Sequence, residues 1–287
     1  MAAAAPVPEG VDLAELEAVA SRVAQAAGRL VLDERPADLR VVSKSSDTDP
    51  VTVMDQRSQE LILRLLAQER PDDAVMGEEE GSTTGTSGLT WVVDPIDGTV
   101  NYLYGIPAYA VSVAVVTGDP TVAGAWESVA GAVLNPETGE LFSAHRGGGA
   151  RLTTAGVSRV LRATEATDLA MALVGTGFGY AATTRARQAA VLVELLPQVR
   201  DIRRHGGAAL DLCGLAAGRL DAYYETALNP WDRAAGELVA REAGAVLGGP
   251  VDDVPTRDLV WGAAPGLAEV FGPLVRELSA RHVGPMD

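Results

Sequence analysis

The chain has 287 residues, of which 47% are hydrophobic and only 5% aromatic, so aliphatic side chains must fill most of its core. This is enough apolar material for one large domain or for two tightly joined lobes. The formal net charge of −16 disfavours nucleic acid and anionic lipid as partners, and a phosphate site would need local cations.

The chain begins with an Ala- and Pro-rich segment, and we expect residues 1–10 to form a disordered tail. This segment lacks the basic start of a signal peptide, and no apolar run reaches the roughly 18 residues of a membrane span. Apolar residues at helical spacing predict a helix over residues 11–32, with Asp12 as its cap. A second helix is predicted over residues 55–69, after a polar stretch at residues 43–50.

Strands and turns dominate the next part of the chain. The predicted strands cover residues 91–94, 110–117, 121–134 and 140–144, and the predicted turns cover residues 135–139 and 147–149.

Strands and helices alternate in the second half, which predicts a layered α/β architecture. The predicted strands cover residues 171–174, 200–203, 220–224 and 259–263, and the predicted helices cover residues 184–196, 208–217, 231–243 and 267–280. Cys213, the only cysteine, lies on an apolar helix face and is expected to pack in the core. A single cysteine excludes an internal disulfide and favours a reducing compartment, the cytoplasm.

The segment Asp94-Pro95-Ile96-Asp97-Gly98-Thr99 carries the strongest chemical signal. Two acids three residues apart follow an apolar strand, Pro95 fixes the backbone between them, and Gly98 permits a tight turn. Two carboxylates and a backbone carbonyl suit a hard cation such as Mg²⁺, and free backbone N–H groups suit phosphate oxygens. A bare pair of acids at this spacing is also typical of an ordinary capped turn, so the whole hexapeptide carries the prediction.

Other acids can complete a cluster around this segment. Glu78 follows an apolar stretch, whereas its neighbours Glu79 and Glu80 fit a solvated loop. Asp55 and Asp232 each open a predicted helix, where capping is the alternative interpretation. The three histidines lack metal-ligand spacing. The pair Arg203-Arg204 suits either an anionic ligand or a solvated edge.

These segments resemble the signature segments of the inositol monophosphatase family, and within it the actinobacterial type. The resemblance covers roughly residues 11–280, and the segments come in the right order. The matching segments are Gly-Glu-Glu at 77–79, residues 91–105, Pro230 to Gly236, Lys44-Ser45-Ser46 with Asp55, and Gly218 to Glu225. It implies an αβαβα layered sandwich, a homodimer, and one phosphatase domain over residues 11–287 with a lobe boundary near residues 150–170.

The resemblance also implies residue roles. Mg²⁺ ions, two or three per site, would be held by Glu78, Asp94, the Ile96 carbonyl, Asp97 and Asp232. Thr99 and Asp55 would orient the attacking water beside Glu78, with Lys44 in support. The substrate contacts would be the N–H groups of Gly98 and Thr99 for phosphate, and Asp97, Gly206, Ala208 and Glu225 for polyol hydroxyls.

The expected reaction is Mg²⁺-dependent hydrolysis of a phosphomonoester, above all myo-inositol monophosphate, by an activated water and without a phospho-enzyme. One alternative is a related sugar phosphatase acting on fructose 1,6-bisphosphate, histidinol phosphate or a phosphoadenosine nucleotide. Another is a non-catalytic regulator that binds RNA or a transcription complex through the same fold.

Overall fold

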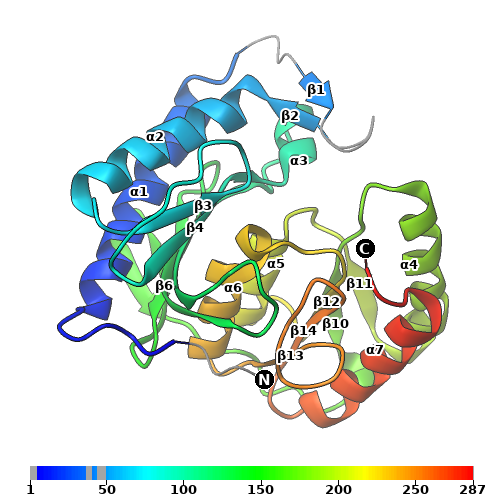
Figure 1. Ribbon diagram of the computed structural model, residues 1–287. Helices are drawn as coiled ribbons and strands as arrows, with labels where there is room; N and C mark the ends of the chain where they lie inside the picture. The colour runs from blue at the N-terminus through cyan, green and yellow to red at the C-terminus, as the bar shows by residue number, and fades with distance from the viewer. Residues whose placement is uncertain (1–4, 37–40, 44–49, 287) are drawn as a thin grey trace.

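The computed structural model describes residues 5–36, 41–43 and 50–286 (Figure 1). Its described strands form a seven-stranded sheet, a five-stranded sheet and one short pair. The seven-stranded sheet follows chain order and is antiparallel except between its first two strands. Its strands are β3 (Ala74–Gly77), β4 (Leu89–Asp97), β5 (Ala110–Gly118), β6 (Trp126–Asn135), β7 (Glu140–His145), β8 (Gly149–Thr154) and β9 (Val157–Val160).

The five-stranded sheet is mixed. Its central strand β12 pairs in parallel with β10 and antiparallel with β14. In spatial order its strands are β11 (Asp201–Arg203), β10 (Leu173–Thr176), β12 (Ala222–Glu225), β14 (Val260–Ala263) and β13 (Val246–Gly248). The short antiparallel pair comprises β1 (Val41–Ser43) and β2 (Pro50–Thr52).

Helices cover the sheets and separate them. The α-helices are α1 (Leu13–Asp33), α2 (Val53–Glu69), α3 (Thr99–Tyr104), α4 (Ala182–Leu195), α5 (Ala208–Ala216), α6 (Pro230–Glu242) and α7 (Ala268–His282), and short 3₁₀ turns occur at Leu169–Met171 and Leu196–Gln198. Asp12 caps α1 as predicted, because its Oδ1 accepts the N–H of Ala14 at 2.9 Å.

Alternating side chains of the large sheet supply two separate cores. On β4, Val93 packs with α1 and α2, whereas its neighbour Val92 packs with α5 and α6 on the opposite face. A third core lies between the small sheet and helices α4 and α7. The layers therefore run α1/α2, large sheet, α5/α6, small sheet, α4/α7 (Figure 1). The predicted αβαβα sandwich is confirmed.

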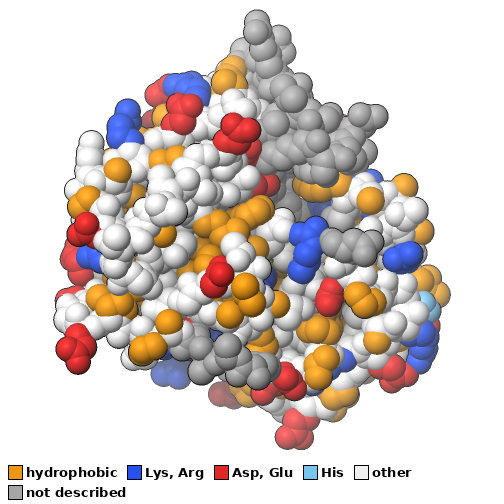
Figure 2. All heavy atoms as spheres, in the orientation of Figure 1, with side chains coloured by type: hydrophobic (Ala, Val, Ile, Leu, Met, Phe, Trp, Pro, Cys, Tyr) orange, Lys and Arg blue, Asp and Glu red, His pale blue; other side chains and the backbone are white. Residues whose placement is uncertain are grey.

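Acidic and basic side chains are intermixed on one face of the molecule (Figure 2). On the face shown in Figure 2, hydrophobic side chains gather near the centre, and acidic and basic side chains are scattered around them. Cys213 is fully buried on α5, as expected. No helix in the described ranges has both the length and the hydropathy needed to cross a membrane.

Several predicted boundaries were wrong. The strand predicted over residues 121–134 begins only at Trp126, because Asp119 and Thr121 form a turn in which the Asp119 carboxylate accepts the Thr121 N–H. The elements β1, β2, β8, β9, β13 and α3 were not predicted. The lobe boundary stays a prediction, as does the disordered tail, of which residues 1–4 lie outside the described part of the chain.

Candidate active site

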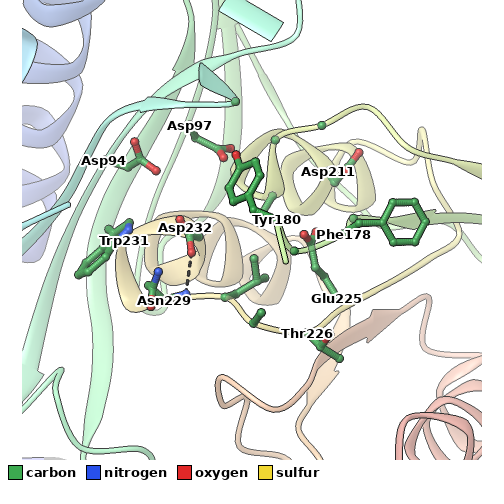
Figure 3. A pocket seen from close by; sticks show the side chains of 18 of the residues that line it. Asp94, Asp97, Phe178, Tyr180, Asp211, Glu225, Thr226, Asn229, Trp231 and Asp232 are labelled. Atoms are coloured by element: carbon green, nitrogen blue, oxygen red, sulfur yellow. Dashed lines mark hydrogen bonds between the residues drawn. The ribbon is translucent and has the colours of Figure 1, made fainter. Parts of the chain in front are cut away.

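A cavity of about 460 Å³ opens between the two sheets, and most of the predicted site residues line it. Asp94, Asp97 and Asp232 surround one part of this cavity, and Glu225 lies farther along it, toward Phe178 (Figure 3). The predicted residues that line it are Glu78, Asp94, Ile96, Asp97, Gly98, Thr99, Gly206, Ala208, Glu225 and Asp232. Asp55 lies just behind this wall, and Lys44 falls outside the described residues.

The end of β4 turns the acidic segment into the cavity. The pairing register with β5 shifts between Asp94 and Asp97, and the N–H of Ile96 donates to Asp94 Oδ1 at 3.0 Å. Gly98 follows with φ of +89°, a conformation that disfavours any side chain. A Cβ at Gly98 would also lie 3.1 Å from the Ala108 carbonyl oxygen and 3.2 Å from the Gly206 carbonyl oxygen, so glycine eases the close approach of these segments.

Thr99 and Asp55 form the predicted pair. Thr99 Oγ1 lies 3.1 Å from Asp55 Oδ1 and 3.0 Å from the Ile96 carbonyl oxygen, and its single hydrogen can serve only one of them at a time. Asp55 also completes a capping box at the start of α2, where its Oδ2 accepts the N–H of Thr52 at 2.8 Å. The capping interpretation of Asp55 is therefore confirmed, and its role in the site stays a prediction.

The acids crowd one another. Burial and the neighbouring carboxylates of Glu78, Asp97 and Asp232 raise the pKa of Asp94 well above its ordinary value. Burial raises the pKa of Asp97 to about 7, against the lowering effect of the Ala209 N–H. Burial followed by Glu78 likewise raises the pKa of Asp232. Repulsion among these buried carboxylates favours either protonation of some of them or the binding of a cation.

Asp97 connects the two halves of the molecule. Its Oδ2 accepts the N–H of Ala209 at the start of α5 at 2.8 Å, across 112 residues of sequence. Asn101 makes a second connection, since its amide donates to the carbonyl oxygen of His205 at 2.6 Å. Asp232 is held differently. It is the third residue of α6 and forms a capping box with Asn229, whose N–H donates to Asp232 Oδ2 at 2.6 Å.

Glu225 ends β12 on the side of the cavity away from the acid cluster. Tyr223, two residues earlier on the same strand face, donates its hydroxyl to Glu225 Oε2 at 2.7 Å. Gly177 leaves room for this carboxylate, because a Cβ there would lie 2.0 Å from Oε1. Burial raises the pKa of Glu225 to about 8. Glu225 is partly buried and lines the cavity rather than the open surface.

Sequence reasoning missed some residues of the site. Asp211 on α5 lines the cavity, and its Oδ1 lies 2.5 Å from His205 Nδ1. Tyr223 was detectable from its two-residue spacing to Glu225 on a strand, whereas no local pattern connects Asp211 to His205. The two neighbouring arginines have different surroundings. Arg203 forms an ion pair with Asp201 at 2.6 Å, whereas Arg204 lines the cavity.

The donor set fits a hard cation. It consists of four carboxylates and the Ile96 carbonyl, all oxygen ligands of the kind that Mg²⁺ takes. Among the described residues, no three His, Cys, Asp or Glu side chains are already arranged as a ready ligand group. The carboxylates nevertheless lie close enough to raise one another's pKa, and a cation would offset that repulsion.

Comparisons with known proteins agree with this geometry. The sequence pattern of the Inositol monophosphatase family matches residues 12–279. The chain is 50% identical to an inositol-1-monophosphatase of Mycobacterium leprae over 80% of this chain and 79% of the relative. It is 39% identical to a protein of Pasteurella multocida named Nus factor SuhB, over 80% of this chain and 83% of the relative. The solved structure of Mycobacterium tuberculosis SuhB superposes with a TM-score of 0.78 at 44% identity, covering 93% of this chain and 98% of that one.

Proposed function

Since the chain belongs to the inositol monophosphatase family, we propose that it is a phosphomonoesterase that hydrolyses myo-inositol monophosphate to inositol and phosphate with Mg²⁺ as cofactor. The observation that carries this proposal is the convergence of Glu78, Asp94, Asp97 and Asp232 on one cavity beside the Thr99–Asp55 pair. These residues come from segments far apart in the chain.

We assign the metal to the four carboxylates and the Ile96 carbonyl. When bound there, Mg²⁺ would lower the pKa of a water molecule and offset negative charge on the phosphate. The N–H groups of Gly98 and Thr99, at the start of α3, face phosphate oxygens, because the first N–H groups of a helix have no partner within it.

The chain's own residues orient the water. When the Thr99 hydroxyl donates to Asp55 Oδ1, its lone pairs can accept a hydrogen bond from the water. As the water oxygen bonds to phosphorus, its proton passes to Thr99 Oγ1 and the Thr99 proton passes to Asp55 Oδ1. The bond between phosphorus and the inositol oxygen breaks, and the departing inositol oxygen takes a proton from solvent water. On the other side of the cavity, Asp97, the backbone near Gly206 and Ala208, and Glu225 hold the polyol hydroxyls.

The test is phosphate release from myo-inositol 1-phosphate with and without Mg²⁺. The variant Asp94→Asn removes a charge from the centre of the acid cluster, and we expect turnover to fall by about two orders of magnitude or more. Near-normal Mg²⁺-dependent rates in a folded Asp94→Asn protein would contradict the assignment.

The same assay separates the alternatives. Faster release from fructose 1,6-bisphosphate, histidinol phosphate or a phosphoadenosine nucleotide would indicate a related sugar or nucleotide phosphatase. No release from any of them would favour a non-catalytic role, an alternative kept because one relative carries the name Nus factor. We also propose a cytoplasmic homodimer without a nucleic-acid partner, which light scattering and a nucleic-acid binding assay would test.

A further inference from the structure

Helix α2 carries three buried polar side chains on one face. Asp55, Ser58 and Gln59 are spaced so that they point the same way, and each is at most 1% exposed. One turn later the same face becomes apolar with Ile62, which packs in the core between α1, α2 and the large sheet. On this face, the middle of α2 therefore makes apolar core contacts, whereas its N-terminal part, near the cavity wall, makes polar contacts.

Each of the three polar side chains contacts a different segment of the site. Asp55 meets Thr99 at the start of α3, and Ser58 Oγ donates to the Pro95 carbonyl oxygen at 3.1 Å, between the two acids of β4. Gln59 reaches the third segment, the loop after β3 that carries Glu78.

Gln59 holds that loop with both ends of its amide. Its Oε1 accepts the N–H of Glu79 at 2.9 Å, and its Nε2 donates to the carbonyl oxygen of Glu80 at 2.7 Å. Gly77 makes room for the amide, because a Cβ at Gly77 would lie 2.3 Å from Gln59 Oε1. On the near side, the N–H of Glu78 donates to the Val93 carbonyl oxygen at 3.2 Å. The backbone of Glu78 is thus fixed on both sides.

We propose that Gln59 is a positioning residue that sets the affinity of the site for Mg²⁺ by holding the Glu78 loop against the end of β4. The inference rests on the proposed function, since it takes Glu78 as a metal ligand. Residues that orient metal ligands through hydrogen bonds typically change metal affinity by about 10- to 100-fold when they are replaced.

The variant Gln59→Met keeps the length and burial of the side chain but removes both hydrogen bonds. We expect its Mg²⁺ dissociation constant, measured by calorimetric titration, to rise by at least about tenfold. The Mg²⁺ concentration for half-maximal phosphate release should rise in parallel. At saturating Mg²⁺ the turnover should stay within roughly threefold of the wild type, because the Thr99–Asp55 pair is unchanged.

Gly77→Ala is the second variant, because its new methyl group displaces the same amide without altering Gln59 itself. Ile62→Val is the matched control, since it removes a buried methyl group from the same helix and this side chain makes no hydrogen bond to the site. It should lower the melting temperature slightly and leave the Mg²⁺ dissociation constant unchanged.

Two results would overturn the inference. One is an unchanged Mg²⁺ dissociation constant in folded Gln59→Met and Gly77→Ala, whatever their melting temperatures. The other is an equal weakening in Ile62→Val, which would mean that any loosening of α2 has this effect. If the wild type binds no Mg²⁺ and releases no phosphate, the proposed function fails instead, so the two failures are distinguishable.

Discussion

Glu225 has one side-chain oxygen with a hydrogen-bond donor and one without, which fits its proposed contact with a polyol hydroxyl. The Tyr223 hydroxyl donates to Oε2, and among the described residues no group donates a hydrogen bond to Oε1, which faces the room left by Gly177. A polyol hydroxyl can supply the missing donor. Above its pKa of about 8 Glu225 is ionised, and a hydrogen bond from a hydroxyl to a charged group contributes roughly 1.5–3 kcal/mol. Glu225 is therefore suited to selecting substrates by their hydroxyls rather than by their phosphate.

We expect Glu225→Gln to lower kcat/KM for myo-inositol 1-phosphate by about tenfold to a hundredfold, the equivalent of one such contact. Glycerol 2-phosphate is too small to reach this carboxylate from the metal site, so its kcat/KM should fall much less. The measurement is kcat/KM for both substrates in both proteins, with the Mg²⁺ dependence as control. Equal losses for the two substrates would place the role of Glu225 in the fold or at the metals.

Glu225 also makes the metal-free protein sensitive to pH. Burial raises its pKa from 4.5 to about 8, so the native state keeps a proton that the unfolded chain releases. The contribution of this group to stability is therefore lost as pH rises through that window. We expect Glu225→Gln in EDTA to melt at a higher temperature than the wild type at pH 8, with little difference at pH 5. The same difference at both pH values would contradict this prediction.

Residues with a local signature were predictable, and residues with distant partners were not. Asp94, Asp97 and Asp232 stand beside Pro, Gly or Trp in recognisable segments, and the structure brings them to one cavity. The partners of Asp97 and Asn101 lie 112 and 104 residues away, and nothing in the local sequence points to them. Gln59 is an intermediate case, because its spacing from Asp55 places both on one helix face.

At the scale of elements, the long helices were predicted because apolar residues recur along one face of each. The short ones were not, since α3 has only six residues and its start depends on the positive φ of Gly98. β9 was missed because all four of its residues are exposed and show no alternation of buried and exposed side chains. An alternating pattern marks a strand only when one of its faces is buried.

The start of α2 joins a helix cap to Asp55, the residue proposed to orient the water. Thr52 accepts the N–H of Met54 at 3.1 Å and donates its hydroxyl to Asp55 Oδ2 at 2.5 Å. We expect Thr52→Ala to reduce the free energy of unfolding by about 1 kcal/mol and also to lower turnover, because Asp55 loses a partner. Thr52→Ser keeps the hydroxyl and should restore both. Denaturant unfolding and phosphate release measure the two effects, and wild-type stability in Thr52→Ala would refute the capping role.

For the whole molecule, the acid cluster opposes folding until a cation joins it. Saturating Mg²⁺ should therefore raise the melting temperature, by the equivalent of about 2.7 kcal/mol at a concentration one hundred times the dissociation constant. Without metal, Asp94→Asn should have a higher melting temperature than the wild type. Its melting temperature should also rise less when Mg²⁺ is added. A thermal scan of both proteins in EDTA and in Mg²⁺ decides this. An unchanged wild-type midpoint, with binding shown by calorimetry, would contradict it.

The cavity walls belong to different layers, and this has a consequence for how the protein fails. β4 brings Asp94 and Asp97, α5 brings the N–H of Ala209, and β12 brings Glu225, so neither sheet alone contains a complete site. The hydrogen bonds within each sheet do not depend on the distance between the layers, whereas the geometry of the site does. Catalysis depends on the docking of the layers, whereas circular dichroism reports only their contents. On heating, phosphate release should therefore be lost at a lower temperature than the circular dichroism signals of the helices and strands. Loss of activity would then report the separation of the layers before secondary structure melts.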